Sequence, residues 1–224
     1  MGDSKELRDV YRVAEIFDSI QGEGYYMGAK ATFIRLQGCP VHCSWCDSEY
    51  TWGKGGESMT LGQIVHAVGE YSKHVVITGG EPMIQNLDSL IKYYMQLRYT
   101  VQIETSGYCW YKGDQRASWV TVSPKPPLNY KVPVEYYRYA QEFKWVIDDN
   151  ITWELLWGSW KLAILERPVR ARVTKWPYFT LMPEGCPPRP EMVEKTLNML
   201  RCVPLNLSEY WRYTDRIQWR IGVK

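Results

Sequence analysis

The chain has 224 residues, of which 45% are apolar, with 11 tryptophans and 17 tyrosines. This length and aromatic content exclude a disordered protein and predict one domain over residues 1–224. The formal net charge of +2 is too small to indicate nucleic acid or an acidic membrane as partner. No apolar run is as long as a membrane span, and the polar N-terminus lacks a signal core. We therefore expect a cytoplasmic protein whose clustered thiols stay reduced.

The first elements in the chain lead up to a loop and a strand. Residues 11–17 are rich in apolar side chains and run into the sequence Gly22-Glu23-Gly24. Glycine lets a backbone approach a ligand closely, although two glycines around a carboxylate are also typical of an ordinary turn. Residues 32–36 are β-rich and predict a strand. Arg35 within that strand either faces solvent or points into a site to hold a carboxylate.

Three cysteines follow this strand with the spacing C-x3-C-x2-C: Cys39, Cys43 and Cys46. Thiolates are soft ligands, suited to zinc or to an iron–sulfur cluster. A structural zinc site needs four protein ligands, whereas three thiolates on a four-iron cluster leave one iron open for another ligand. The alternatives are plain redox cysteines and a zinc site completed by a fourth side chain. The candidates for that ligand are His42, Cys109, Cys186 and Cys202.

Beyond the cysteines, helical and strand patterns alternate. Thr60 to Gln63 has the form of a capping box for a helix that extends to about Tyr71. Further helices are predicted over residues 87–94, 153–160 and 190–202. Strands are predicted over residues 74–78, 100–103, 119–122, 141–147 and 178–182, with a final strand within residues 215–224. We expect the tryptophans of residues 153–160 to serve core packing or a subunit contact.

This alternation predicts an α/β fold with a parallel sheet and helices outside it. Several strands end in small or polar residues, at Gly79-Gly80-Glu81, at Glu104 and at Ser123-Pro124-Lys125. The carboxyl ends of parallel strands converge, so we expect these residues to share one pocket. The strand count, about six, is too low for a closed eight-stranded barrel. An open, partial β/α barrel is therefore expected.

The cysteine spacing, with Trp45 just before the last cysteine, resembles the signature of radical S-adenosylmethionine (SAM) enzymes. In that superfamily SAM binds the open iron of a [4Fe–4S] cluster, and the reduced cluster cleaves SAM to a 5′-deoxyadenosyl radical. Further stretches are similar to the 7-carboxy-7-deazaguanine synthase family: residues 20–24, 33–48, 76–82, 102–107 and 119–125. This resemblance implies a lyase that converts 6-carboxy-5,6,7,8-tetrahydropterin to 7-carboxy-7-deazaguanine and ammonia in 7-deazapurine (queuosine-type) biosynthesis, with SAM used catalytically and with Mg²⁺.

The same resemblance implies a role for each matching residue. The cluster ligands would be Cys39, Cys43 and Cys46. The positions that match SAM contacts are Trp45, Cys46, Asp47, Gly79, Gly80, Glu81, Glu104, Ser123, Pro124 and Lys125. Those that match substrate contacts are Ile20, Gln21, Gly22, Arg35, Thr78 and Lys224, and Ser48 matches a ligand of Mg²⁺. No side chain is assigned as a general acid or base, and the implied partners are the pterin, an electron donor such as flavodoxin, and a second copy in a homodimer.

Two other hypotheses fit parts of this pattern. A radical SAM activase, which forms a glycyl radical on a partner protein, shares the cysteine spacing but needs no small-molecule pocket built from Ile20 to Gly22 and Arg35. A zinc-stabilised binding module would not be an enzyme at all, and colourless protein with stoichiometric zinc would indicate it.

Overall fold

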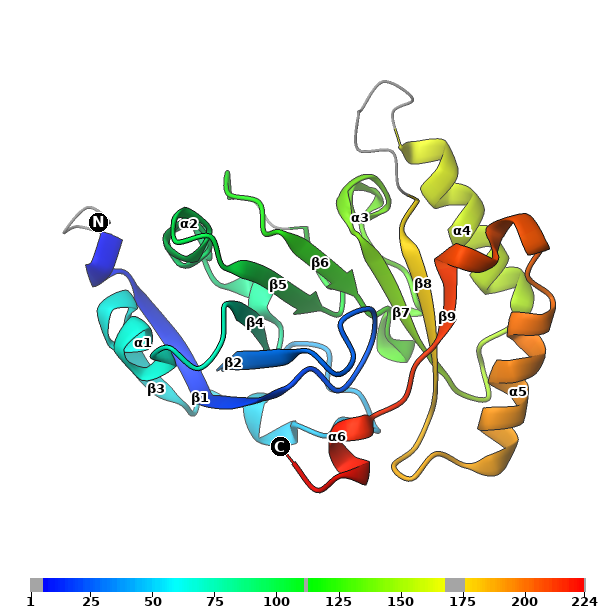
Figure 1. The fold of residues 1–224 in the computed structure, drawn as a ribbon, viewed down its shortest axis with the longest axis horizontal. Helices are drawn as coiled ribbons and strands as arrows, with labels where there is room; N and C mark the ends of the chain where they lie inside the picture. Colours follow the sequence, from blue (N-terminus) through cyan, green and yellow to red (C-terminus); the bar gives the residue numbers. More distant parts are fainter. Residues whose placement is uncertain (1–5, 111–112, 168–175, 224) are drawn as a thin grey trace.

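The computed structural model describes residues 6–110, 113–167 and 176–223. These form one curved, open sheet in the order β3-β1-β2-β4-β5-β6-β7-β8-β9 (Figure 1). Strand β2 and strands β4 to β9 form the parallel part of the sheet. Strand β1 is antiparallel to both of its neighbours, β2 and β3. Their bounds are β1 Val10–Ile20, β2 Lys30–Leu36, β3 Glu57–Thr60, β4 His74–Gly79, β5 Thr100–Thr105, β6 Trp119–Val122, β7 Glu142–Ile147, β8 Tyr178–Pro183 and β9 Trp211–Tyr213.

Helices α1 to α5 lie along the outer side of this sheet (Figure 1). The α-helices are α1 Leu61–Val68, α2 Asp88–Gln96, α3 Val134–Tyr139, α4 Trp153–Glu166, α5 Pro190–Arg201 and α6 Ile217–Arg220. Short 3₁₀ turns are η1 Glu6–Arg8, η2 Glu49–Thr51, η3 Pro82–Ile84, η4 Pro126–Leu128 and η5 Leu205–Tyr210. None of the helices in the described ranges has the length and apolar character needed to cross a bilayer.

Side chains alternate between the two faces of each strand, because successive residues point in opposite directions. On β4, Val75 and Ile77 belong to the main core, which also contains buried side chains of the outer helices. Val76 points to the inner face and Thr78 lines a cavity there. The buried polar residues on the inner face of β5 to β8 are Gln102, Thr121, Glu142, Lys144 and Thr180. The sheet therefore separates an apolar core from a polar interior.

A loop, rather than strand pairing, fills the N-terminal end of the open barrel. This loop, residues 21–29, connects β1 to β2 and crosses the barrel to reach β6 and β8. The ring of Tyr25 lies 4.5 Å, between ring centroids, from Trp119 and from Tyr178, at the starts of β6 and β8. The Arg212 guanidinium of β9 lies 4.7 Å from the centroid of the same ring. The opposite, C-terminal end of the parallel strands is left for a pocket.

The expected open β/α barrel is confirmed, and all six predicted parallel strands are present. The count of about six was too low, because the sheet has nine strands. The additional strands are β1, β3 and β9, of which β3 has four residues and β9 three, too short for a periodic pattern to stand out. The capping box at Thr60 is confirmed, although helix α1 ends at Val68, because Gly69 adopts a φ of +56°.

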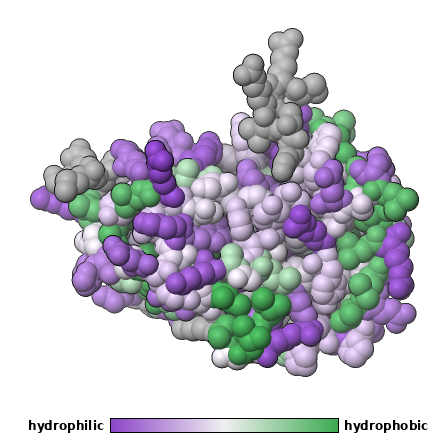
Figure 2. Space-filling view, in the orientation of Figure 1, coloured by the Kyte–Doolittle hydropathy of each residue, from purple (hydrophilic) through white to green (hydrophobic). Residues whose placement is uncertain are grey.

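The predicted final strand within residues 215–224 is wrong. β9 takes the edge position earlier in the chain, and the segment that follows turns away from the sheet into α6. The backbone N–H of Ile217 donates to the carbonyl of Gly22, so this segment lies against the 21–29 loop. Beyond it, Ile221 and Val223 are 61% and 44% exposed. Figure 2 shows an apolar surface at the position of α6.

The tryptophans of α4 pack into the core. Trp160 is completely buried, and its ring contacts Phe179 of β8 at 5.2 Å and Trp211 of β9 at 5.5 Å between centroids. Replacing Trp160 with Ala should lower the free energy of unfolding by about 3–5 kcal/mol, because it removes a large buried side chain and leaves a cavity. Urea unfolding measures this. Leu165→Ala on the same helix is the control, since Leu165 is 79% exposed and should change stability by less than about 0.5 kcal/mol.

Candidate active site

A cavity of about 190 Å³ opens at the C-terminal ends of the parallel strands. It brings together residues from the cysteine loop, the 21–29 loop, seven strands and the C-terminal segment. Most of the residues predicted from sequence line it: Ile20, Gln21, Gly22, Arg35, Cys39, Cys43, Trp45, Cys46, Asp47, Ser48, Thr78, Gly79, Gly80, Glu104, Ser123 and Lys125. The shared pocket expected from the strand ends is therefore present.

The cysteine loop presents three free thiols to this cavity. Burial raises the pKa of the Cys39 and Cys43 thiols, so in the absence of a metal both favour the neutral form. Backbone groups of Val41 and His42 act in the opposite direction by hydrogen bonding to Cys39, and the N–H of Ser48 donates to Cys46 Sγ at 3.4 Å. Soft donors with N–H groups around them suit an iron–sulfur cluster.

The candidate fourth zinc ligands lie elsewhere. His42 is exposed and stacks on Trp52, with ring centroids 4.8 Å apart. Cys109 contacts the carbonyl of Met83, while Cys186 and Cys202 are exposed. None of these four side chains is among those that line the cavity within the described part of the chain. The donor set at this site is therefore three thiols, which fits a cluster with one open iron better than a closed zinc site.

Arg35 points into the cavity. Its Nε donates to Glu15 Oε1 at 2.9 Å, and its Nη1 donates to Ser48 Oγ at 3.0 Å. The Ser48 hydroxyl in turn donates to Asp47 Oδ1 at 3.1 Å. The guanidinium and the neighbouring oxygens of Ser48 and Asp47 are thereby fixed at one place. The guanidinium suits an anionic group, and the oxygens suit a hard cation that itself binds such a group.

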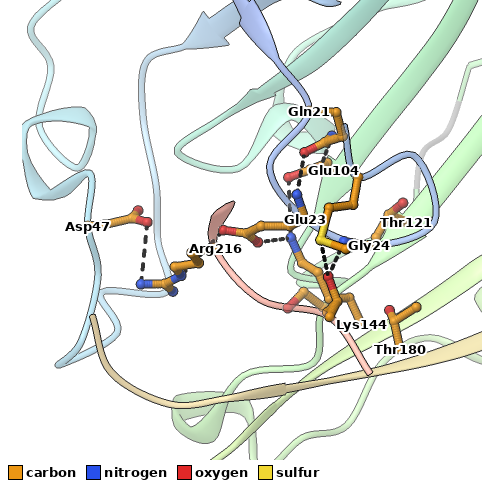
Figure 3. Close-up of polar contacts among 12 residues, drawn as sticks. Gln21, Glu23, Gly24, Asp47, Glu104, Thr121, Lys144, Thr180 and Arg216 are labelled. Carbon is orange, nitrogen blue, oxygen red and sulfur yellow. Dashed lines mark hydrogen bonds and ion pairs between the residues drawn. The ribbon is translucent and has the colours of Figure 1, made fainter. Parts of the chain in front are cut away.

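Glu23 and Lys144 form an ion pair inside the barrel (Figure 3). Lys144 Nζ lies 2.6 Å from Glu23 Oε2 and 3.5 Å from Glu104 Oε2. Burial opposes the charge on both groups, but the attraction outweighs it. Lys144 and Arg216 lower the pKa of Glu23 to about 2, and Glu104 and Glu23 raise the pKa of Lys144. Gln21 Nε2 donates to Glu104 Oε1 at 2.8 Å, which joins the loop to β5 and β7.

The C-terminal segment supplies the opposite wall of the cavity. Arg216 Nε lies 3.3 Å from Glu23 Oε1 and its Nη1 lies 3.8 Å from Asp47 Oδ2 (Figure 3). Gln218 Nε2 donates to Glu23 Oε1 at 3.2 Å. A Cβ added at Gly22 would lie 1.6 Å from Gln218 Oε1, so a larger residue at position 22 would displace the Gln218 side chain from its place beside Glu23.

Lys125 lines the same cavity as the thiols and Lys144. Its ammonium donates to Ser123 Oγ at 2.9 Å and lies 4.8 Å from the centroid of the Trp45 ring. Burial, followed by repulsion from Lys144, lowers the pKa of Lys125. A cation at this position favours anionic groups nearby, including thiolates and a carboxylate.

Two of the predicted residues within the described ranges, Glu81 and Pro124, do not line the cavity. Glu81 is completely buried, and its carboxylate accepts hydrogen bonds from the backbone of Met83 and Ser106 and from the hydroxyls of Thr105 and Ser106. These bonds tie the Gly79–Gly80 turn to the end of β5. Pro124 is buried and is not among the residues of the cavity lining. Lys224 lies outside the described residues.

Sequence reasoning missed several residues of the site. Those with charged or amide side chains are Glu23, Lys144, Arg216 and Gln218 in the cavity wall, and Glu15, the partner of Arg35. Glu23 had a local signal, its two flanking glycines, which also fit an ordinary turn. The other four become recognisable only when the fold brings distant segments together, because nothing in their local sequence differs from ordinary strand or surface positions.

An open β/α barrel with a three-thiol loop at the C-terminal end of its strands defines a radical SAM enzyme. The radical SAM superfamily model matches residues 33–121. Over 83% of the chain, the sequence is 35% identical to 7-carboxy-7-deazaguanine synthase from Aquifex aeolicus, covering 82% of that protein. The enzyme of the same name from Synechocystis is 42% identical over 68% of the chain and 74% of its own length.

A solved structure is similar as well. The crystal structure of QueE from Escherichia coli superposes with a TM-score of 0.65 at 27% identity, covering 92% of this chain and 93% of that one. The chain belongs to the 7-carboxy-7-deazaguanine synthase family. Neither the activase nor the zinc-stabilised binding module is favoured by these similarities.

The buried Glu23 predicts a specific acid sensitivity. Its pKa falls from 4.5 to about 2 on folding, so its stabilising effect is complete above pH ~4.5 and is lost as the pH falls toward about 2. The difference in unfolding free energy between the wild type and Glu23→Gln should therefore narrow by roughly 2 kcal/mol between pH 6 and pH 3. Urea titrations measure it. Glu70→Gln, at an exposed residue, should show no such narrowing, and an unchanged gap for Glu23→Gln would contradict the ion-pair assignment.

Proposed function

We propose that this enzyme converts 6-carboxy-5,6,7,8-tetrahydropterin to 7-carboxy-7-deazaguanine with loss of ammonia. The observation that supports this most is the polarity of one cavity. Three thiols, a guanidinium beside Ser48, and the acceptor-rich loop around Glu23 all line it. A molecule with a carboxylate at one end and several N–H donors at the other matches that arrangement.

In this proposal Cys39, Cys43 and Cys46 hold the [4Fe–4S] cluster. When bound, the cluster and SAM supply the radical that initiates the reaction. The chain would orient SAM through the backbone of Trp45, Cys46 and Asp47, through the glycines Gly79 and Gly80, and through Glu104, Ser123 and Lys125. Glycines suit this because they let the backbone approach the cofactor closely, and Glu81 would support SAM indirectly by fixing their turn.

The two ends of the substrate would meet different residues. Arg35 would hold the carboxylate, together with Mg²⁺ bound to Ser48, since a hard cation prefers oxygen ligands. Ile20, Gln21, Gly22 and Thr78 would contact the ring system, with Glu23 as a further acceptor. The ion pair with Lys144 keeps Glu23 ionised and therefore able only to accept, which suits N–H groups. Lys224 would complete this end.

We extend the proposal to the setting of the enzyme. The cluster must be reduced before it acts, so an electron donor such as flavodoxin is required. A reducing cytoplasm suits three free thiols. A homodimer of single-domain chains, residues 1–224 each, would cover exposed apolar side chains such as Leu205, which is 92% exposed.

An anaerobic turnover assay tests the proposed reaction. Reconstituted enzyme with dithionite, SAM, Mg²⁺ and the carboxypterin should form 7-carboxy-7-deazaguanine, detected by mass spectrometry. If no deazaguanine forms although the same preparation cleaves SAM, the substrate assignment is wrong.

The ligand assignment predicts the outcome of single cysteine substitutions. Cys39→Ala, Cys43→Ala and Cys46→Ala should each abolish both the brown cluster absorbance and SAM cleavage, because two thiolates do not hold the cluster. Cys202→Ala is the matched control: its thiol is exposed, and iron content and SAM cleavage should be unchanged. A variant at Cys43 that keeps full iron content would refute the assignment.

The role proposed for Ser48 predicts altered metal dependence. Ser48→Ala removes an oxygen ligand, so the stimulation of turnover by Mg²⁺ should shrink while SAM binding stays near normal. Ser48→Cys should shift the preference toward softer divalent ions. Ser44→Ala, an exposed serine of the same loop, serves as control. Metal titrations that superimpose for the wild type and both Ser48 variants would exclude this role.

A further inference from the structure

Glu142 is a buried carboxylate that the proposed reaction does not use. It begins β7, is completely buried, and does not line the cavity. Burial raises the pKa of its carboxyl group. An ionised group in such a position is costly unless every lone pair is satisfied, and an apolar side chain of similar size is often the more stable choice. Its presence therefore needs an explanation other than stability.

Four hydrogen bonds converge on this carboxylate. The hydroxyls of Thr180 and Thr121 donate to Oε1 at 2.6 Å and to Oε2 at 2.8 Å. Trp119 Nε1 donates to Oε2 at 3.3 Å. The fourth donor is the backbone N–H of Tyr25, at 2.9 Å from Oε1. Three donors thus come from β6 and β8 and orient the carboxylate, while the fourth belongs to the 21–29 loop.

The loop is shaped to meet this carboxylate. Gly24 has a φ of +71°, and a Cβ added there would lie 2.7 Å from Glu142 Oε1, so a glycine is required at this approach. The N–H of Gly24 donates to Thr214 Oγ1 at 2.7 Å, which holds the loop from the other side. Two consecutive backbone N–H groups, those of Gly24 and Tyr25, are therefore anchored.

The anchor lies immediately beside Glu23. On β7, Glu142, Lys144 and Val146 share the inner face because they are two residues apart, and Lys144 and Val146 line the cavity. Glu142 therefore lies in a layer of side chains just below the cavity. Lys144 lies in the next layer, which forms part of the cavity wall. Holding Tyr25 at the lower layer brings Glu23, two residues earlier, level with Lys144.

We propose that Glu142 is a positioning residue: by fixing the backbone at Tyr25, it sets the place of Glu23 in the substrate pocket. The proposal rests on the proposed function in taking Glu23 as a contact of the pterin. Without the Glu142 anchor the loop and Glu23 would move relative to Lys144, and the substrate would be held less well in front of SAM. The consequence would be weaker pterin binding and SAM cleavage that no longer leads to product.

The test compares three variants. Glu142→Met keeps the length of the side chain but accepts no strong hydrogen bond, and Glu142→Gln keeps one carbonyl oxygen for Tyr25 and Thr180. Asp148→Asn is the matched control: Asp148 is also a buried carboxylate, and it accepts from Tyr130 and from the backbone of Asn150 and Ile151, away from the cavity lining. Cluster content and SAM affinity should be close to wild type in all three.

Two readouts decide the matter. The first is amide hydrogen exchange over residues 22–26 in protein without substrate, which should accelerate about tenfold or more in Glu142→Met. The second is turnover: KM for the carboxypterin should rise about tenfold, equivalent to ~1.4 kcal/mol, and the ratio of 5′-deoxyadenosine to deazaguanine should rise with it. Glu142→Gln should show smaller changes of the same kind, and Asp148→Asn neither.

The proposal is overturned if Glu142→Met unfolds more easily but keeps wild-type exchange in the loop and a wild-type product ratio, since Glu142 would then be merely structural. Equal changes in Asp148→Asn would overturn it too. If the wild type makes no deazaguanine, the proposed reaction fails. The exchange measurement then still decides whether Glu142 anchors the loop, so the two failures are distinguishable.

Discussion

The ion pair between Glu23 and Lys144 is the interaction on which the rest of the site depends. The sheet is open, so its two edges are not joined by strand pairing. Lys144 projects from β7 into the barrel. Burial of its charged ammonium group there would be too costly without an oppositely charged partner. That partner, Glu23, comes from the loop between β1 and β2, at the other side of the sheet, at 2.6 Å. The pair therefore joins the two sides of the barrel and forms the bottom of the pocket.

The alternation of side chains along the parallel strands lets one sheet serve both stability and chemistry. Apolar residues on the outer face pack under helices, as Phe179 of β8 and Trp211 of β9 do against Trp160 of α4, so the core does not depend on the pocket. The inner face is free to carry costly polar groups, each held by partners from neighbouring strands or from the 21–29 loop, as the four donors around Glu142 illustrate. The cysteine loop then needs only to follow β2 to reach the same cavity.

Much of this architecture was predictable from local sequence. Apolar runs indicated the six parallel strands, and their polar ends indicated a shared pocket, because both signals are local. The final strand was predicted wrongly, since loose alternation in residues 215–224 gives no information on the contacts of Arg216 and Ile217 with the 21–29 loop. The roles of Lys144 and Glu142 could not be predicted from the sequence for a related reason. A charge within a strand is interpretable only when its partner, more than a hundred residues away, is known.

A double-mutant cycle on Glu23 and Lys144 tests the central claim most directly. The unfolding free energy is measured for the wild type, Glu23→Gln, Lys144→Met and the double variant. If the pair joins the two sides of the barrel, each single variant leaves a buried group without its partner, and the double variant should be less destabilised than the sum by at least ~1.5 kcal/mol. Effects that add to within about 0.5 kcal/mol would show that the two residues act independently, and the account of the pocket would be wrong.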